Sequence, residues 1–267
     1  PEQNEYVVQS AMEAFETKGD WRQSTLLVLQ MLKGAEELTG NVSNAALAAM
    51  KACLKASPSQ SVIVERLITQ LPVLRTALQH DTIMASEVLH AAVQSRNATS
   101  LKALINVFQN ENIAVMTKAL AAVVNVLDEI EEYEEAVKVF ESTIAQHIHP
   151  KHYSHEACSQ SRDDAMYVDL HGYSVAVAKA AVRSALGILR RMDKPLNLVL
   201  ITGRGKKSSK SNHERLDPVL KPSVQRWLSS SEPPLTPAEL VGNTGRLIVS
   251  NELIETWASS VPSGFKS

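Results

Sequence analysis

The sequence predicts an α + α/β protein, in which an α-helical solenoid is followed by a small α/β domain. Three observations carry this prediction. A chain of 267 residues is long enough to bury two separate cores. Residues 5–148 show helical apolar spacing, with few glycines and no strand-like alternation. From residue 165 onwards, short apolar runs alternate with helical patterns, as they do in α/β layer domains.

Composition narrows the class of protein further. Hydrophobic residues make up 44% of the chain, charged residues 21% and aromatic residues 4%, an aliphatic balance that favours helices. No apolar run is long enough to span a bilayer, so we expect no membrane insertion. The two cysteines, Cys53 and Cys158, are too few for a disulfide framework.

Charge is distributed unevenly along the chain. Residues 1–159 hold 12 Lys and Arg against 19 Asp and Glu, a net charge of −7, whereas residues 160–267 hold 15 against 10, a net charge of +5. Within Arg183–Arg226 the count is 11 basic against 3 acidic residues. This local excess of +8 suits a nucleic-acid phosphate backbone, although a solvated helix face is the alternative for such a run.

Two segments of the helical half share a pattern. Residues 18–31 and 130–150 each combine a turn, a small residue at an expected helix contact and an apolar stripe, with Ser24 and Ala136 as the small residues. Further turns give spacings of roughly 35 to 40 residues. We therefore predict that residues 1–150 form consecutive antiparallel helix pairs that stack into an array.

A histidine cluster follows the last predicted helix. Residues 147–158 contain four histidines and a cysteine, which are side chains that can bind zinc. However, the cluster has no Cys-x-x-Cys pair and flanks Pro150 and a polar stretch. We interpret residues 151–164 as a solvated linker and expect no structural metal there.

The remaining elements form a domain at residues 165–250, followed by a C-terminal tail at 251–267. The predicted elements are strand Ala165–Leu170, helix Val175–Arg191, strand Asn197–Ile201, a basic loop, helix Asp217–Leu228, an irregular stretch Ser229–Pro237 and strand Gly245–Val249.

The ends of the first two strands carry the candidate site. Side chains alternate along a strand, so Asp169 and His171 point the same way and Leu170 points the opposite way. The second strand leads into a loop whose glycines let backbone N–H groups approach an anion, and lysines follow them. The candidate anion-binding residues are Thr202, Gly203, Arg204, Gly205, Lys206, Lys207 and Lys210.

Four motifs at these positions resemble the small MutS-related (Smr) domain. They read DLHGYSVAVAKAAV, LITGRGKKS, LKPSVQRWL and NTGRLIV, in that order, and span residues 166–249. The resemblance is to the form found at the C-terminus of plant-type pentatricopeptide-repeat (PPR) proteins, and the helical half resembles a degenerate PPR array. It implies an α/β domain with the architecture of the C-terminal domain of bacterial translation initiation factor three. It also implies an organellar RNA-binding protein, in the plastid or mitochondrion.

The resemblance leaves two readings of the site open. In one, the domain is an RNA endonuclease in which His171 exchanges protons and Asp169 orients it or holds a divalent metal. In the other, the same residues bind RNA and break no bond. Many relatives carry a histidine where this chain has Lys207, and this departure favours binding over cleavage. No cofactor beyond that divalent metal is expected.

The helical half has two readings as well. In PPR proteins the groove of the array reads RNA, one base per repeat. The equivalent positions here are Gln9 and Ala121, and an alanine cannot read a base edge. Because this half is also acidic, we expect a scaffold that docks protein subunits of a larger complex. For the whole chain the alternative is a non-catalytic structural or scaffold subunit of a large ribonucleoprotein or transcription assembly, such as an organellar ribosome or RNA polymerase.

Overall fold

The computed structural model describes residues 10, 14–15, 17–18, 20–32, 40–56, 59–144, 165–203, 219–240 and 243–260. Contacts divide the chain into two compact units, Pro1–Glu132 and Tyr133–Ser267. The division falls earlier than the predicted linker at residues 151–164, which lies outside the described residues. Each unit has its own set of buried apolar side chains.

The first unit is built of helices. Its described helices are α2 (Trp21–Leu32), α3 (Gly40–Lys55), α4 (Ser61–Gln70), α5 (Pro72–His80), α6 (Thr82–Ser95), α7 (Ala98–Asn110) and α8 (Thr117–Glu129). No strand occurs among the described residues of this unit, which confirms the predicted helical half.

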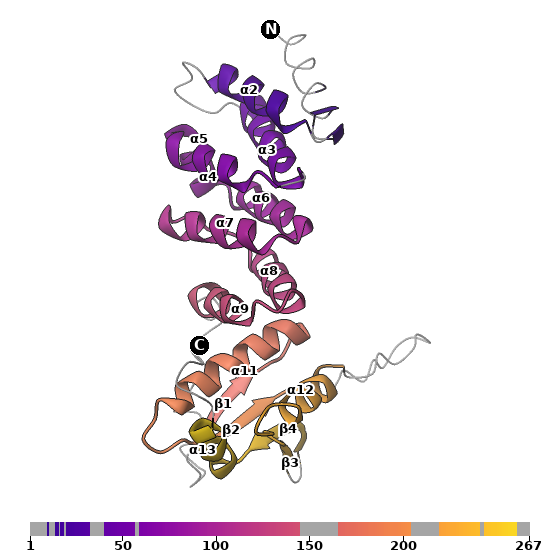
Figure 1. Ribbon diagram of the computed structural model, residues 1–267, viewed down its shortest axis with the longest axis vertical. Coiled ribbons are helices and arrows are strands. Elements are labelled where there is room, and N and C mark those ends of the chain that lie inside the picture. Colours follow the sequence, from indigo (N-terminus) through magenta and orange to yellow (C-terminus); the bar gives the residue numbers. More distant parts are fainter. Residues whose placement is uncertain are drawn as a thin grey trace, which may run out of the picture. The chain divides into compact units, whose positions relative to one another are not determined.

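The helices of the first unit stack in two layers. Helices α3, α6 and α8 lie side by side in one layer, while α4 and α7 lie side by side in the other (Figure 1). Small residues let neighbouring helices approach closely. Ala49 of α3 and Ala92 of α6 are fully buried, and Ser24 of α2 is fully buried with its hydroxyl donating to the Asp20 carbonyl at 3.0 Å. Ser24 is therefore buried inside the first unit, and its hydroxyl is used within its own helical turn.

A proline lengthens one step of this stack. Pro72 has no backbone N–H and forces the preceding Leu71 into an extended conformation, with φ −108° and ψ 92°. One apolar segment is thereby split into the two helices α4 and α5. The additional short helix therefore lengthens the span between the end of α3 and the start of α7.

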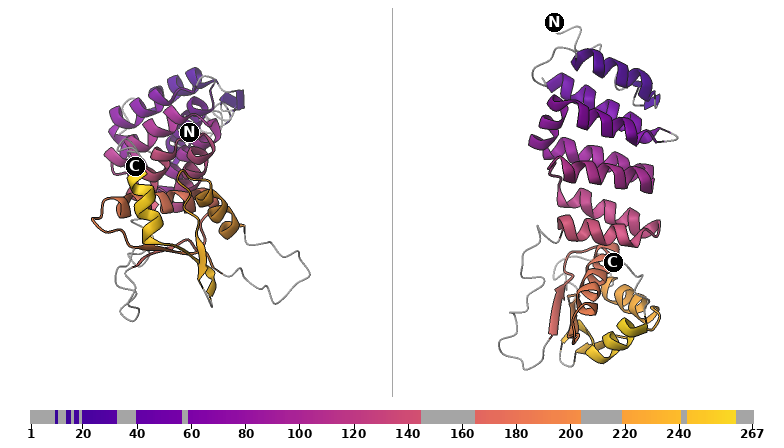
Figure 2. Two further views of the ribbon diagram at one scale, coloured as in Figure 1. Left: turned by 60° about the horizontal axis from the view of Figure 1, so that its bottom comes forward. Right: turned by 60° about the vertical axis from the view of Figure 1, so that its left-hand side comes forward.

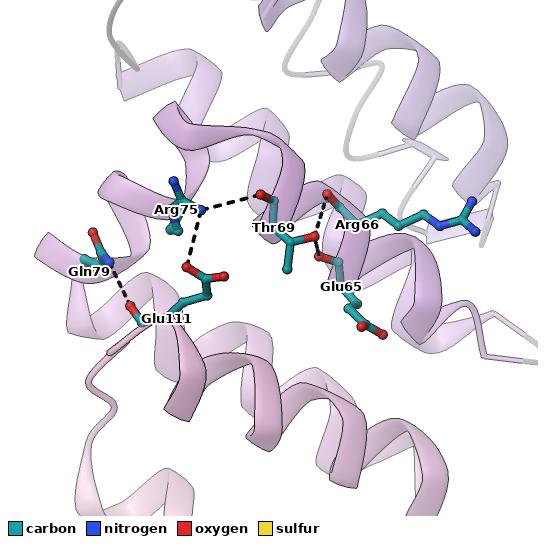
Figure 3. Close-up of polar contacts among 6 residues, drawn as sticks. All are labelled: Glu65, Arg66, Thr69, Arg75, Gln79 and Glu111. Carbon is teal, nitrogen blue, oxygen red and sulfur yellow. Dashed lines mark hydrogen bonds and ion pairs between the residues drawn. The ribbon is translucent and has the colours of Figure 1, made fainter.

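Polar contacts hold the additional helix in place. The Arg75 guanidinium of α5 lies 3.3 Å from the carboxylate of Glu111, at the end of α7, and 3.5 Å from the Thr69 carbonyl of α4 (Figure 3). The Gln79 side chain donates to the Glu111 carbonyl at 2.7 Å. Arg75 and Gln79, one helical turn apart on α5, thus hold this helix to the end of α7.

The second unit combines helices with one sheet. Its described elements are α9 (Tyr133–Val139), a π-helical turn η1 (Phe140–Ile144), β1 (Ala165–Asp169), α11 (Val175–Arg190), β2 (Asn197–Ile201), α12 (Leu220–Ser229), β3 (Ala238–Leu240), β4 (Asn243–Val249) and α13 (Asn251–Ser260). Every predicted strand and helix of this domain is present, with bounds that shift by a few residues at most. Two elements were not predicted, the short strand β3 and the helix α13 within the expected tail.

The sheet is mixed, in the order β1-β2-β4-β3. Strands β1 and β2 are parallel, joined through α11, and Asp169 pairs with Ile201 at their ends. Strand β4 runs antiparallel to β2, and Ile201 pairs with Arg246. The carboxyl ends of β1 and β2 and the beginning of β4 therefore share one edge of the sheet.

The two faces of the sheet differ in burial. The alternate residues on one face are almost completely buried: Met166, Val168, Leu198, Leu200, Leu247 and Val249. Helices α11, α12 and α13 lie on one side of the sheet (Figure 2, left), and the contacts of α11 with β1 and of α13 with β2 match this covered face. On the opposite face Val199 is buried, whereas Tyr167, Asp169, Ile201, Arg246 and Ile248 are half-buried. We call this second face the open face.

Helix α9 and its π-helical turn pack against α11 of the sheet domain. Phe140 is fully buried and meets the Tyr173 ring edge-on, with ring centroids 6.1 Å apart. The Ser184 hydroxyl of α11 donates to the Glu141 carboxylate at 2.7 Å. The prediction assigned residues 133–144 to the helical half, whereas the contacts place them in the second unit.

None of the described helices is both long and apolar enough to cross a bilayer.

Candidate nucleic-acid site

The candidate site lies where β1 and β2 end. In a parallel pair the carboxyl ends of both strands meet at one edge, where the following loops form a crevice that suits a ligand. The turn after β1 carries His171 and Gly172, and the loop after β2 begins with Thr202 and Gly203. Leu170, between the two polar residues, is fully buried and its N–H donates to the Ile201 carbonyl at 2.9 Å. The alternation expected from the sequence is therefore present.

Asp169 and His171 form a bonded pair. The His171 backbone N–H donates to Asp169 Oδ1 at 2.9 Å, and Nδ1 of the imidazole lies 2.5 Å from the same oxygen. A carboxylate accepts hydrogen bonds, so this contact places the proton of a neutral imidazole on Nδ1 and leaves Nε2 with its lone pair. The His171 side chain is 56% exposed, and Nε2 is the atom offered to a ligand.

Gly203 lies directly against this imidazole. Its φ is +79°, in the left-handed region that glycine adopts most easily, and an added Cβ would meet His171 Nε2 at 2.7 Å. Any side chain at position 203 would therefore both strain the backbone and press on the ring. Gly203, in the loop after β2, and His171, in the turn after β1, are therefore in direct contact although they lie 32 positions apart in the sequence.

Thr202 fixes the start of the loop. Its backbone N–H donates to the Gly245 carbonyl at 3.0 Å, and its hydroxyl donates to the same carbonyl at 3.2 Å. Both donors are thus used on β4. The sequence suggested that Thr202 contacts phosphate, but its geometry is that of an anchor that holds the loop to the sheet.

The cationic part of the loop lies outside the described residues. This holds for Arg204, Gly205, Lys206, Lys207 and Lys210. The structure shows the point from which this segment leaves the sheet, directly beside His171 Nε2. The positive charges therefore follow the pair within a few residues of chain.

The structure adds Tyr173 to the surroundings of the pair. Burial, and then the negative charge of Asp169, raise the pKa of its phenol to about 12. Sequence reasoning missed this residue, because its two neighbours, Asp169 and Phe140, become informative only once the chain is folded.

Among the described residues, no group of three or more His, Cys, Asp or Glu side chains is placed to hold a metal ion. The histidine cluster at residues 147–158 lies outside them.

The mixed sheet, the bonded Asp-x-His pair and the glycine beneath its imidazole coincide with a known domain family. Residues 168–250 match the Smr domain. The match begins in β1 and ends directly after β4, so the Smr domain contains every residue of the candidate site described above. Smr domains are associated with nucleic-acid binding and with nuclease activity. Helices α9 and α13 lie outside the matched residues. The comparison with curated proteins found no match.

Proposed function

We propose that the Smr domain of this protein binds RNA, and that holding RNA phosphates at the β1–β2 edge is its primary activity. The observation that carries the proposal is the left-handed Gly203 at the edge where β1 and β2 end, because the cationic sequence Arg204–Lys210 follows it directly. The excess of +8 within Arg183–Arg226 supplies the long-range attraction for a phosphate backbone.

The same geometry suits proton transfer. Cleavage of a phosphodiester needs a base for the attacking oxygen, an acid for the leaving oxygen and positive groups around the phosphorus. His171 Nε2, oriented through Nδ1 by Asp169, is placed to take a proton, and the loop cations are available for the charge. A second acid or base is the missing part, because Lys207 stands where many Smr relatives have histidine. We therefore expect a slow nuclease or none, and Asp169 could also help to hold a divalent metal in such a reaction.

We further propose that the helical unit is a degenerate PPR-like array that docks protein subunits, in a plastid or mitochondrion. The ion pairs of this unit favour a protein-docking scaffold rather than an RNA-reading array, because they engage cations that could otherwise contact phosphates. Four of its cations are paired with a carboxylate: Lys51 with Glu87, Arg75 with Glu111, Arg96 with Glu129 and Lys102 with Glu132. The alternative for the whole chain is a non-catalytic subunit of a large ribonucleoprotein or transcription assembly. The ion-paired surface of the helical unit supports this alternative as well.

Binding and cleavage are separated by two variants of the full chain. Replacing Arg204, Lys206 and Lys207 together by alanine should weaken RNA binding on all sequences and lower the dependence of log Kd on log salt by about 3, because each phosphate contact contributes about 1. Fluorescence anisotropy over a salt series measures this. A chain without salt-sensitive RNA affinity contradicts the proposal.

The second variant, His171→Ala, leaves the loop cations intact. RNA affinity should change little, while any cleavage in a single-turnover assay should fall by about 10²–10⁴. The scaffold alternative expects no cleavage by the unaltered chain at any pH or with any divalent metal. Cleavage that survives the loss of both Asp169 and His171 would refute the proposed roles of this pair.

A further inference from the structure

The open face of the sheet carries a cation that the sequence motifs did not single out. Arg246 of β4 pairs with Ile201 of β2, which in turn pairs with Asp169 of β1. Directly paired residues on neighbouring strands point to the same face of a sheet. Arg246 and Asp169 therefore project from the same face, at the same edge of the sheet. Since neighbouring strands lie about 4.8 Å apart, and β2 lies between β1 and β4, the two residues are about 10 Å apart.

Arg246 has no anionic partner in the described part of the chain. No hydrogen bond or ion pair there engages its guanidinium, and the residue is half-buried. The carboxylate of Asp169 is occupied by His171. Glu239 of β3 pairs with Leu247 and so lies on the covered face, where it accepts from Lys221 of α12 at 2.6 Å. The described acids near this end of the sheet are therefore engaged elsewhere.

Apolar and aromatic residues form the next row of the open face. Tyr167, Val199 and Ile248 pair in register across β1, β2 and β4, one step inward from the row that ends in Arg246. Proteins that bind single-stranded nucleic acid combine a positive path for the backbone with aromatic side chains on which bases stack. The open face offers one group of each kind, the Arg246 guanidinium in the row at the edge and the half-buried Tyr167 ring in the next row.

We propose that the open face is a track for single-stranded RNA, with Arg246 contacting a phosphate and Tyr167 stacking against a base. The track runs along the described strands from the edge at which β2 ends in Ile201. The inference rests on the proposed RNA binding of the domain and specifies its path and its preferred substrate. Side chains on the flat surface of a sheet can stack against unpaired bases, whereas the bases of a duplex are stacked inside the double helix and are out of their reach.

The track is tested with the full chain and a fluorescent oligouridylate of about a dozen nucleotides, with a blunt RNA duplex as competitor. Arg246→Gln should weaken binding several-fold and lower the salt slope by about 1. Tyr167→Leu should weaken binding roughly tenfold without changing the salt slope, while Tyr167→Phe should bind like the unaltered chain. The duplex should compete poorly.

Arg191→Gln is the matched control. Arg191 is an exposed arginine that follows α11, where the chain turns toward the start of β2 at the opposite edge of the sheet. It should affect binding much less than Arg246→Gln. Arg246→Lys, which keeps the charge, should restore most of the lost affinity and the salt slope. Thermal melting of each variant excludes loss of the fold as the cause.

Two results would overturn the track. One is an equal loss with Arg191→Gln and Arg246→Gln, and the other is unchanged affinity with Tyr167→Leu. If the loop variant weakens binding while both open-face variants bind normally, the track fails and the proposed RNA binding stands. If the unaltered chain binds no RNA, the proposed function fails and the track fails with it.

Discussion

Tyr173 connects the candidate site to the core of its unit. Its ring packs edge-on against the buried Phe140, and its phenol feels the charge of Asp169. Both burial and the negative charge favour the neutral phenol, which is why its pKa is raised to about 12. At neutral pH Tyr173 is therefore an uncharged neighbour of the Asp169–His171 pair.

This shift gives a prediction for alkaline pH. The folded protein keeps the Tyr173 proton up to about pH 12, whereas an unfolded tyrosine loses it near 10. The associated stabilisation is complete below about pH 10 and is lost as pH rises through about 12, because there the native state binds more protons than the unfolded state. Absorbance of tyrosinate after a rapid pH jump, taken as the difference from Tyr173→Phe, should show this late titration.

Asp169→Asn provides the test of the cause. Removing the negative charge should lower the Tyr173 midpoint, while burial keeps it above that of an exposed tyrosine. An unchanged midpoint in this variant means that Asp169 does not act on the phenol.

Sequence reasoning found some site residues and missed others for a geometric reason. Asp169 and His171 are two positions apart on one strand, so alternation alone places them together. Gly203 was identified as a loop glycine, but its contact with the imidazole depends on the pairing of β1 with β2. Arg246 was missed because its place in the same cross-strand row as Asp169 depends on two strand registers, and no local pattern encodes these.

At the scale of elements, α9 and η1 act as a brace for the sheet domain. The Arg183 guanidinium of α11 lies over two aromatic rings, 4.2 Å from the Tyr133 centroid and 4.9 Å from that of Trp227 on α12. Cation–π contacts of this kind contribute about 0.5–2 kcal/mol each. The brace thus joins α9, α11 and α12 from outside the matched Smr residues.

The brace makes Phe140→Ala informative. Truncating this fully buried ring should destabilise the second unit by about 3–5 kcal/mol. It should also lower the Tyr173 titration midpoint, because the phenol loses the cover that raises its pKa. The measurements are urea unfolding and the tyrosinate difference spectrum.

Phe108→Ala in α7 is the control of equal size. Phe108 is buried in the first unit, so its truncation should destabilise that unit and leave the Tyr173 titration unchanged. If Phe140→Ala and Phe108→Ala have the same effect on Tyr173, the brace is not specific to the second unit.

The elements that sequence reasoning missed are those with the weakest local patterns. Strand β3 has three residues and a register shift at Glu239 and Leu240, too short and irregular for alternation to be visible. Helix α13 has one fully buried residue, Ile254, and most of its other residues are exposed, as the residues of a tail would be. Residues 133–144 have the same helical pattern as the array, and only their contacts with α11 separate them from it.

At the scale of the whole molecule, the two units carry opposite charge. Residues 1–132 hold 10 Lys and Arg against 15 Asp and Glu, and residues 133–267 hold 17 against 14. Net charges of −5 and +3 separate an acidic stack from a basic α/β unit within one chain. RNA affinity is therefore expected to depend on the second unit alone.

Leu89→Ala tests this division of labour. Leu89 of α6 is almost fully buried between the neighbouring helices of the stack, so the change should cost about 2–5 kcal/mol of stability in the first unit. RNA affinity at low temperature should stay the same. The matched change Leu200→Ala in β2 should instead reduce RNA binding, because it loosens the strand that ends at Gly203. Loss of RNA binding with Leu89→Ala alone contradicts the assignment.

The pairing of Asp169 with Ile201 has one further consequence. Side chains of a strand point alternately to the two faces of the sheet. A slip of β1 by a single residue would exchange the faces, turning Met166 and Val168 toward water and Asp169 toward α11. The burial of the core residues and the position of the polar pair therefore depend on the same alternation of side chains along β1. One residue inserted into β1 or deleted from it would therefore disrupt the hydrophobic core and the Asp169–His171 pair together.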